Sequence, residues 1–91
     1  MDNKTFAGVD AATWEKLKAL GSSQHGTVFD PADAASGTAT TRTPIGSLVL
    51  AFAFDSASNS VTYTIVEKPF FVASGLVWSG VEDCIRKCRQ A

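Results

Sequence analysis

Two neighbouring segments alternate large and small side chains, and this alternation limits how the chain can fold more than any other feature does. In residues 46–54 the large side chains occupy even positions, whereas in residues 61–68 they occupy odd positions. Side chains of a β-strand point alternately to its two faces, so the large residues of both segments share a face only if paired residue numbers add up to an odd number. The turn-rich residues 55–60 allow that register. The alternation therefore predicts an antiparallel hairpin.

This register separates large from small residues across the predicted hairpin. The large pairs are Phe54 with Val61, Phe52 with Tyr63 and Leu50 with Ile65. The other side is predicted to carry Ala53 with Thr62, Ala51 with Thr64 and Val49 with Val66. We call this second side the small-residue face, which consists of Val49, Ala51, Ala53, Thr62, Thr64 and Val66. We expect the large residues to be buried and the small-residue face to stay uncovered.

A first helix is predicted before the hairpin, over about residues 10–20. Asp10 can cap the free backbone N–H groups at its start, and Val9 and Trp14 can form a hydrophobic staple. Gly21 supplies a stop. The apolar stripe of this helix consists of Trp14, Leu17 and Leu20. We therefore expect the helix to rest on a core.

A second helix is predicted over about residues 75–90, with Ser74 as its N-cap and Pro69 ending the strand before it. Its apolar residues fall within an arc of about 120° that contains no charge. These residues are Val77, Trp78, Val81, Cys84, Ile85 and Cys88. Basic residues near the C-terminal end complement the helix dipole, which explains them through helix stability alone.

The segments between these elements leave alternatives open. Residues 25–29 either form a short strand or do not pair at all. Residues 30–43 contain no large apolar side chain, so we expect a flexible loop there that is either functional or disordered. The chain is therefore predicted to be a single α+β domain of order α-β-β-β-α, in which two helices pack on one face of a small two- or three-stranded antiparallel sheet.

Charge and hydropathy exclude several classes of partner. Eight Lys and Arg residues oppose nine Asp and Glu residues, which removes the basic surface expected of a nucleic-acid or anionic-membrane binder. The longest apolar run, Leu48 to Phe54, is far shorter than the roughly twenty residues that a membrane-spanning helix needs. The first residues carry no basic stretch followed by an apolar one, so a cytoplasmic protein is expected.

The predicted order of elements resembles that of double-stranded-RNA-binding domains. That family binds RNA through a basic cluster at the start of its second helix. Here the corresponding residues 74–79 carry no charge. The resemblance therefore covers the order of elements and does not extend to RNA binding, because a fold alone does not carry a function.

Two cysteines and one histidine are the candidates for chemistry. Cys84 and Cys88 are four residues apart on a helix, but a structural zinc site needs four ligands and His25 is the single histidine. Both sulfurs fall within the apolar arc, so we expect packed thiols of low reactivity. A Cys–His pair would need a spatial approach that residue spacing does not reveal. We predict no metal, no cofactor and no catalytic residue.

Two functions from different classes fit these observations. The first is a non-enzymatic protein-interaction module that binds a protein partner or itself, as a homodimer, through the small-residue face. The alternative is a protein that binds a small apolar ligand in the region of Phe70, Phe71 and Trp78, with residues 30–43 as a lid. A third hypothesis, an enzyme that uses Cys84 or Cys88, requires a reactive thiol.

Overall fold

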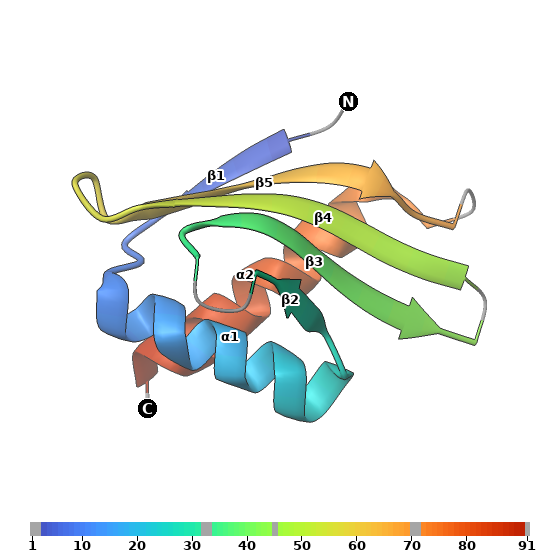
Figure 1. Ribbon diagram of the computed structural model, residues 1–91, viewed down its shortest axis with the longest axis horizontal. Coiled ribbons are helices and arrows are strands. Elements are labelled where there is room, and N and C mark those ends of the chain that lie inside the picture. The colour runs from blue at the N-terminus through green and yellow to red at the C-terminus, as the bar shows by residue number, and fades with distance from the viewer. Residues whose placement is uncertain (1–2, 32–33, 45, 70–71, 91) are drawn as a thin grey trace.

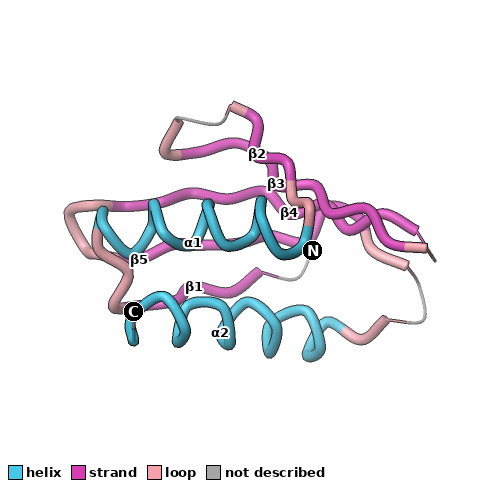
Figure 2. The backbone as a smooth tube through the Cα atoms, turned by 90° about the horizontal axis from the view of Figure 1, so that it is seen from below, coloured by secondary structure: helices cyan, strands magenta, loops and turns pink. Residues whose placement is uncertain are grey.

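A five-stranded antiparallel sheet carries two helices on one of its faces in the computed structural model, which describes residues 3–31, 34–44, 46–69 and 72–90 (Figure 1). The strand order across the sheet is β1-β5-β4-β3-β2. In chain order the elements are β1 (Asn3–Ala7), α1 (Ala11–His25), β2 (Val28–Asp30), β3 (Ser36–Thr43), β4 (Gly46–Asp55), β5 (Ser60–Glu67) and α2 (Ser74–Gln90). The two helices run antiparallel in one layer beside the sheet (Figure 2).

The α+β class and the two helices are confirmed, but the predicted strand number and order are wrong. The sheet has five strands rather than two or three, and β1 precedes α1, so the order is β-α-β-β-β-β-α. The chain therefore does not keep the element order of double-stranded-RNA-binding domains. Of the two alternatives for residues 25–29, the short strand is present as β2, which begins at Val28 and extends to Asp30.

Most of the segment predicted as a loop is the strand β3. Its eight residues pair with β4 from Ser36 opposite Ala53 to Thr43 opposite Gly46. Ala39 is the one fully buried residue of β3. Because the buried position of β3 holds only an alanine, the strand shows no alternation of large and small residues. The lack of large apolar side chains therefore predicted a loop. The β-branched threonines of this segment suit a strand that is held mainly by its backbone ladder.

The hairpin register is confirmed for the three large pairs and for two of the three small ones. Phe52 lies opposite Tyr63, and Ala51 lies opposite Thr64. The predicted pair of Val49 with Val66 is wrong, because the register shifts after Leu50 and Val49 pairs with Glu67 instead. Val66 is thus an extra residue on β5, and such a bulge locally bends and twists a strand.

Helix α1 begins as predicted and ends later. The Asp10 carboxylate accepts a hydrogen bond from the Thr13 backbone N–H at 2.8 Å, and this bond lowers the pKa of Asp10. The helix passes through Gly21 and ends at His25, because Gly26 adopts the left-handed conformation (φ 65°) that terminates helices. Gly21 lies close to β2, since a Cβ there would be 3.4 Å from the Phe29 ring, in van der Waals contact.

Aromatic rings fasten α1 to the sheet. The Trp14 ring stacks on Phe54 with ring centroids 5.4 Å apart and an interplanar angle of 6°. It also lies 5.3 Å from the Phe52 ring and meets the Phe29 ring edge-on at 6.3 Å. One side chain therefore joins α1 to β4 and β2.

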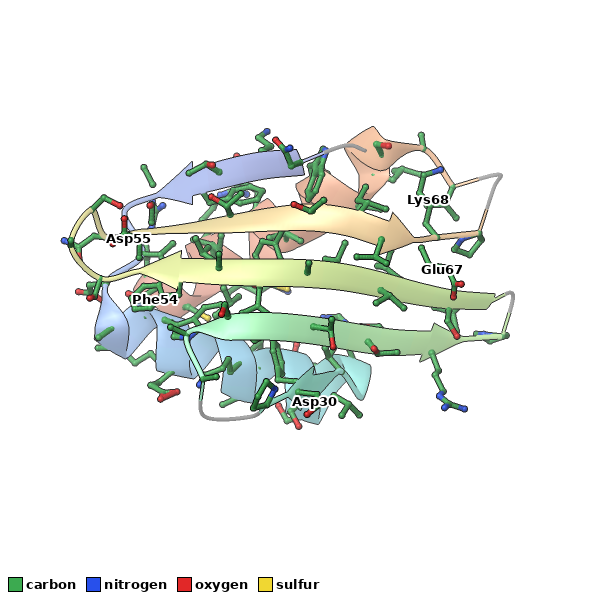
Figure 3. The ribbon with its side chains drawn as sticks, turned by 45° about the horizontal axis from the view of Figure 1, so that its top comes forward. Asp30, Phe54, Asp55, Glu67 and Lys68 are labelled. Carbon is green, nitrogen blue, oxygen red and sulfur yellow. The ribbon has the colours of Figure 1, made fainter. Side chains whose placement is uncertain are left out.

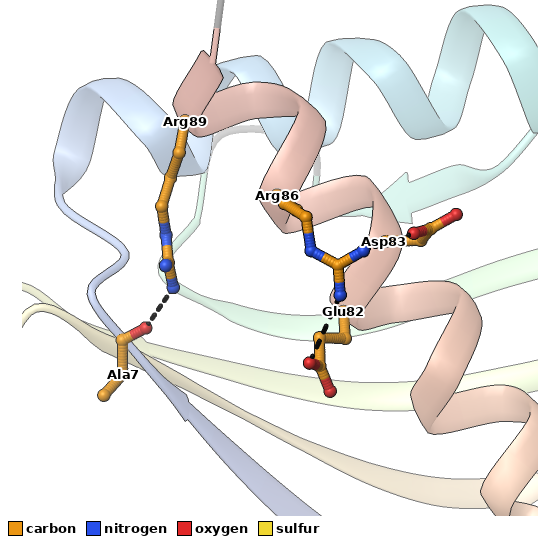
Figure 4. A network of polar contacts seen from close by, with 5 residues as sticks. All are labelled: Ala7, Glu82, Asp83, Arg86 and Arg89. Atoms are coloured by element: carbon orange, nitrogen blue, oxygen red, sulfur yellow. Dashed lines mark hydrogen bonds and ion pairs between the residues drawn. The ribbon is translucent and has the colours of Figure 1, made fainter.

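The C-terminal end of α2 is tied to β1. The Arg89 guanidinium donates a hydrogen bond to the Ala7 carbonyl oxygen at 2.8 Å, while Arg86 pairs with Glu82 and Asp83 on the same helix (Figure 4). Helix stability alone was expected to explain the basic residues of this end. The contact of Arg89 shows that one of them also holds the first strand.

Replacing the tryptophan at the centre of the aromatic cluster tests this packing. We expect Trp14→Ala to lower the free energy of unfolding by about 3–5 kcal/mol, because it removes a buried aromatic ring and leaves a cavity. Trp78→Ala is the matched control and should cost less, since Trp78 is only half-buried. Urea unfolding followed by circular dichroism measures both. Equal losses for the two variants would contradict the central role of Trp14.

Candidate functional site

A pocket of about 320 Å³ lies between the C-terminal half of α1 and the N-terminal half of α2, with the sheet as its floor. The floor consists of Ala39, Leu48, Leu50 and Tyr63. The facing walls consist of Leu17, Gly21 and His25 from α1 and of Val77, Gly80, Val81 and Cys84 from α2. The lining is thus apolar, with a few polar groups among its residues, as in most small-molecule sites.

Two helix glycines leave space for this pocket. Gly21 of α1 and Gly80 of α2 both line it. A Cβ added at Gly80 would meet no atom within 4 Å, so the position opens into empty space. The sequence places Gly80 on the solvent side of its helix, where a glycine weakens the helix by about 1 kcal/mol relative to alanine. In the structure Gly80 is exposed and borders the pocket.

The Tyr63 hydroxyl is a polar group without a partner at the floor of this pocket. The residue is only 4% exposed, and its hydroxyl makes no hydrogen bond within the described part of the chain. No fully buried side-chain oxygen or nitrogen lacks a partner among the described residues, so the Tyr63 hydroxyl oxygen is not fully enclosed, and the residue lines the pocket. Burial, with a smaller contribution from Cys84 and Cys88, raises the pKa of Tyr63 and keeps the hydroxyl protonated.

A cysteine and the histidine meet on the pocket walls. The Cys84 sulfur lies 3.7 Å from Nε2 of His25, although the two residues are 59 positions apart. Cys84 is half-buried, and burial raises the pKa of its thiol, with Asp83 adding to the shift and Lys87 opposing it. Residue spacing could not reveal this pair, because it depends on α1 continuing past Gly21 to His25.

Of the predicted apolar-ligand residues, Phe70 and Phe71 lie outside the described residues. Trp78 packs against Phe6 of β1, with ring centroids 6.2 Å apart, and is not among the residues that line the pocket. The apolar cavity of this fold is thus built from other residues of α2, with α1 as the opposite wall.

Ala51 and Thr64 of the small-residue face alternate along their strands with the buried Phe52 and Tyr63, so they point to the opposite side of the sheet. Figure 3 looks onto the side of the sheet that the helices do not cover. Ala53 and Val66 are exposed, and the remaining four residues are half-buried. Strands β1 and β3 widen this face with more threonines: Thr5 pairs with Thr62, their hydroxyl oxygens 2.8 Å apart, and Thr38 lies opposite Ala51. The sequence predicts the part of this surface on β4 and β5. It does not predict the parts on β1 and β3, because it does not predict these two strands.

Comparisons of this chain with protein-family models, with curated proteins and with solved structures find no match. Within the described ranges, no group of three or more His, Cys, Asp or Glu side chains could hold a metal ion. Neither described helix combines the length and the apolar character needed to cross a membrane.

The shifted pKa values predict how stability changes at alkaline pH. Cys84, Cys88 and Tyr63 all have raised pKa values in the folded chain, so the unfolded chain loses these protons first as the pH rises. The free energy of unfolding should therefore be unaffected by these groups below pH 8 and should fall above about pH 8.5–10, where unfolded Cys and Tyr titrate. Urea midpoints measured at pH 7, 9 and 10.5 test this. Tyr63→Phe should flatten the decline above pH 10, and an unchanged slope would contradict the assignment.

Proposed function

We propose that this protein binds a small, largely apolar molecule in the pocket between α1 and α2. The observation that carries the proposal is Tyr63, which lines this apolar pocket and whose hydroxyl lacks a hydrogen-bond partner among the described residues. The volume of about 320 Å³ lies at the lower end of the range for small-molecule pockets, about 300–1,000 Å³.

The polar groups of the pocket indicate what kind of molecule fits. The Thr27 and Thr41 hydroxyls are 2.7 Å apart and hydrogen-bond to each other, whereas Tyr63 has no such partner among the described residues. The protonated Tyr63 hydroxyl is thus available to donate a hydrogen bond to a ligand, and a buried donor without a partner is costly. A molecule with an apolar body and one acceptor, such as a ketone, would supply that partner. We take medium-chain ketones as the probe class.

Titration with octan-3-one, followed by amide chemical shifts in NMR, tests the binding function. Saturable shifts should appear at Gly21, Gly80 and Leu48. Gly80→Phe should abolish them by filling the pocket. Gly75→Phe is the matched control, because an added Cβ at Gly75 also meets no atom within 4 Å, yet Gly75 does not line the pocket. Shifts that never saturate, or that survive Gly80→Phe, would rule out this site.

The role of Tyr63 is tested by removing its oxygen. Tyr63→Phe should weaken octan-3-one binding about fivefold, since the lost hydrogen bond contributes on the order of 1 kcal/mol. Toluene, which has no carbonyl, should bind the variant and the original protein alike. Equal affinity for octan-3-one in both proteins would exclude Tyr63 as the anchor.

A second proposed function is self-association through the small-residue face. What supports it is the distribution of charge, since the centre of this face carries none and both signs stand at its rim. Arg42 follows Thr38 and Thr40 with a period of two on β3, while Asp30 and Glu67 lie at the ends of other strands (Figure 3). A twofold dimer needs such a self-complementary patch.

Sedimentation equilibrium measures this association. The protein should form a dimer, and Ala51→Lys should shift it to a monomer by placing a charge in the middle of the face. Ser79→Lys on the exposed side of α2 is the control and should leave the dimer intact. A monomer at every concentration would refute this second function.

A further inference from the structure

The sulfur of Cys84 combines three features that no other described thiol shares. It lines an apolar pocket, it is half-buried rather than enclosed, and it lies 3.7 Å from Nε2 of His25. Cys88, one turn later on the same helix, is only 5% exposed and does not line the pocket. A nucleophile with a base within reach at the side of a binding cavity is the arrangement that covalent chemistry uses.

A second and independent observation points to a ligand at this place. Tyr63, which is only 4% exposed, lines the same pocket, and its hydroxyl has no hydrogen-bond partner among the described residues. Such a donor suits a carbonyl oxygen, and it suits an oxygen that gains negative charge during a reaction even better. Thiol, base and oxyanion donor therefore belong to three elements, α2, α1 and β5, that share one cavity.

We infer that Cys84 is a covalent capture site for α,β-unsaturated ketones and aldehydes with an apolar tail, and that His25 is its general base. The inference rests on the proposed binding function of the pocket. The tail occupies the apolar space between the helices, and the carbonyl oxygen accepts a hydrogen bond from Tyr63. The thiol then meets the β-carbon of the bound molecule.

The reaction balances without any further reactant. The Cys84 thiol proton moves to Nε2 of His25 as the sulfur forms a bond to the β-carbon. The electron pair of the carbon–carbon double bond moves toward the carbonyl, which becomes an enolate held by the Tyr63 hydroxyl. The His25 proton then passes to the α-carbon. The product is a thioether, no group leaves, and nothing is oxidised or reduced.

The surroundings of Cys84 explain why a base is needed. Burial and Asp83 raise the pKa of its thiol, and only Lys87 opposes the shift, so a neutral thiol prevails near pH 7. A thiol alone is a poor nucleophile. His25 removes the proton during the attack, which general bases typically accelerate by 10²–10⁴-fold.

Labelling with oct-1-en-3-one, followed by intact-protein mass spectrometry and peptide mapping, tests the inference on the full chain. The protein should gain one molecule of the enone, on Cys84, and Cys88→Ser should gain it at the same rate. His25→Gln should slow labelling at least tenfold at pH 7 and should keep the circular dichroism spectrum, because His25 is exposed. Gly80→Phe should slow it similarly, whereas Gly75→Phe should not.

Two controls separate this inference from the binding function. Acrylamide has no apolar tail, so its rate of reaction with Cys84 should not change in Gly80→Phe. Octan-3-one, the saturated ketone, reports pocket binding without the reaction. If octan-3-one saturates the pocket while Cys84 reacts no faster than N-acetylcysteine, or His25→Gln labels as fast as the original protein, covalent capture is overturned and binding stands. If octan-3-one does not bind, both fail together.

Discussion

The structure depends on one constraint, the sorting of side chains by size onto the two faces of a single sheet. Phe52 and Tyr63 lie opposite each other, and both turn their rings toward the helices. Their neighbours Ala51 and Thr64 turn the other way. Because the large residues need a cover and the small ones do not, both helices lie on the same face, and the layer order of the whole molecule follows.

Packing is uneven under the helices, and that unevenness produces the pocket. At one end the Trp14 ring fills the space between α1 and the sheet through its contacts with Phe52 and Phe54. Elsewhere along both helices, Gly21 and Gly80 border the pocket of about 320 Å³. A Cβ at Gly80 would meet no atom within 4 Å, so this position does not need a glycine for close packing. The proposed binding function would use this open space.

The sequence predicted the elements correctly where the alternation of residue size or the amphipathic spacing was strong, as in the hairpin of β4 and β5 and in α2. It failed for β1 and β3, whose buried positions are single residues, Phe6 and Ala39, in otherwise small or polar segments. Such strands form because their backbones hydrogen-bond to a neighbouring strand, and no local pattern of side chains indicates that pairing. The pairing of His25 with Cys84 was hidden for a related reason. A glycine such as Gly21 often ends a helix, but α1 continues through it to His25 and ends at Gly26.

The place of β1 at the sheet edge has a consequence for folding. β1 begins at Asn3, yet its hydrogen-bonding partner is β5, and its Ala7 carbonyl is held by Arg89 of α2, 82 positions away. β1 therefore stays unpaired until β5 and α2 are available to receive it. Closure over such a span is slow for entropic reasons. Docking of β1 is thus expected to be a late step in the assembly of the sheet, although β1 precedes its partners along the chain.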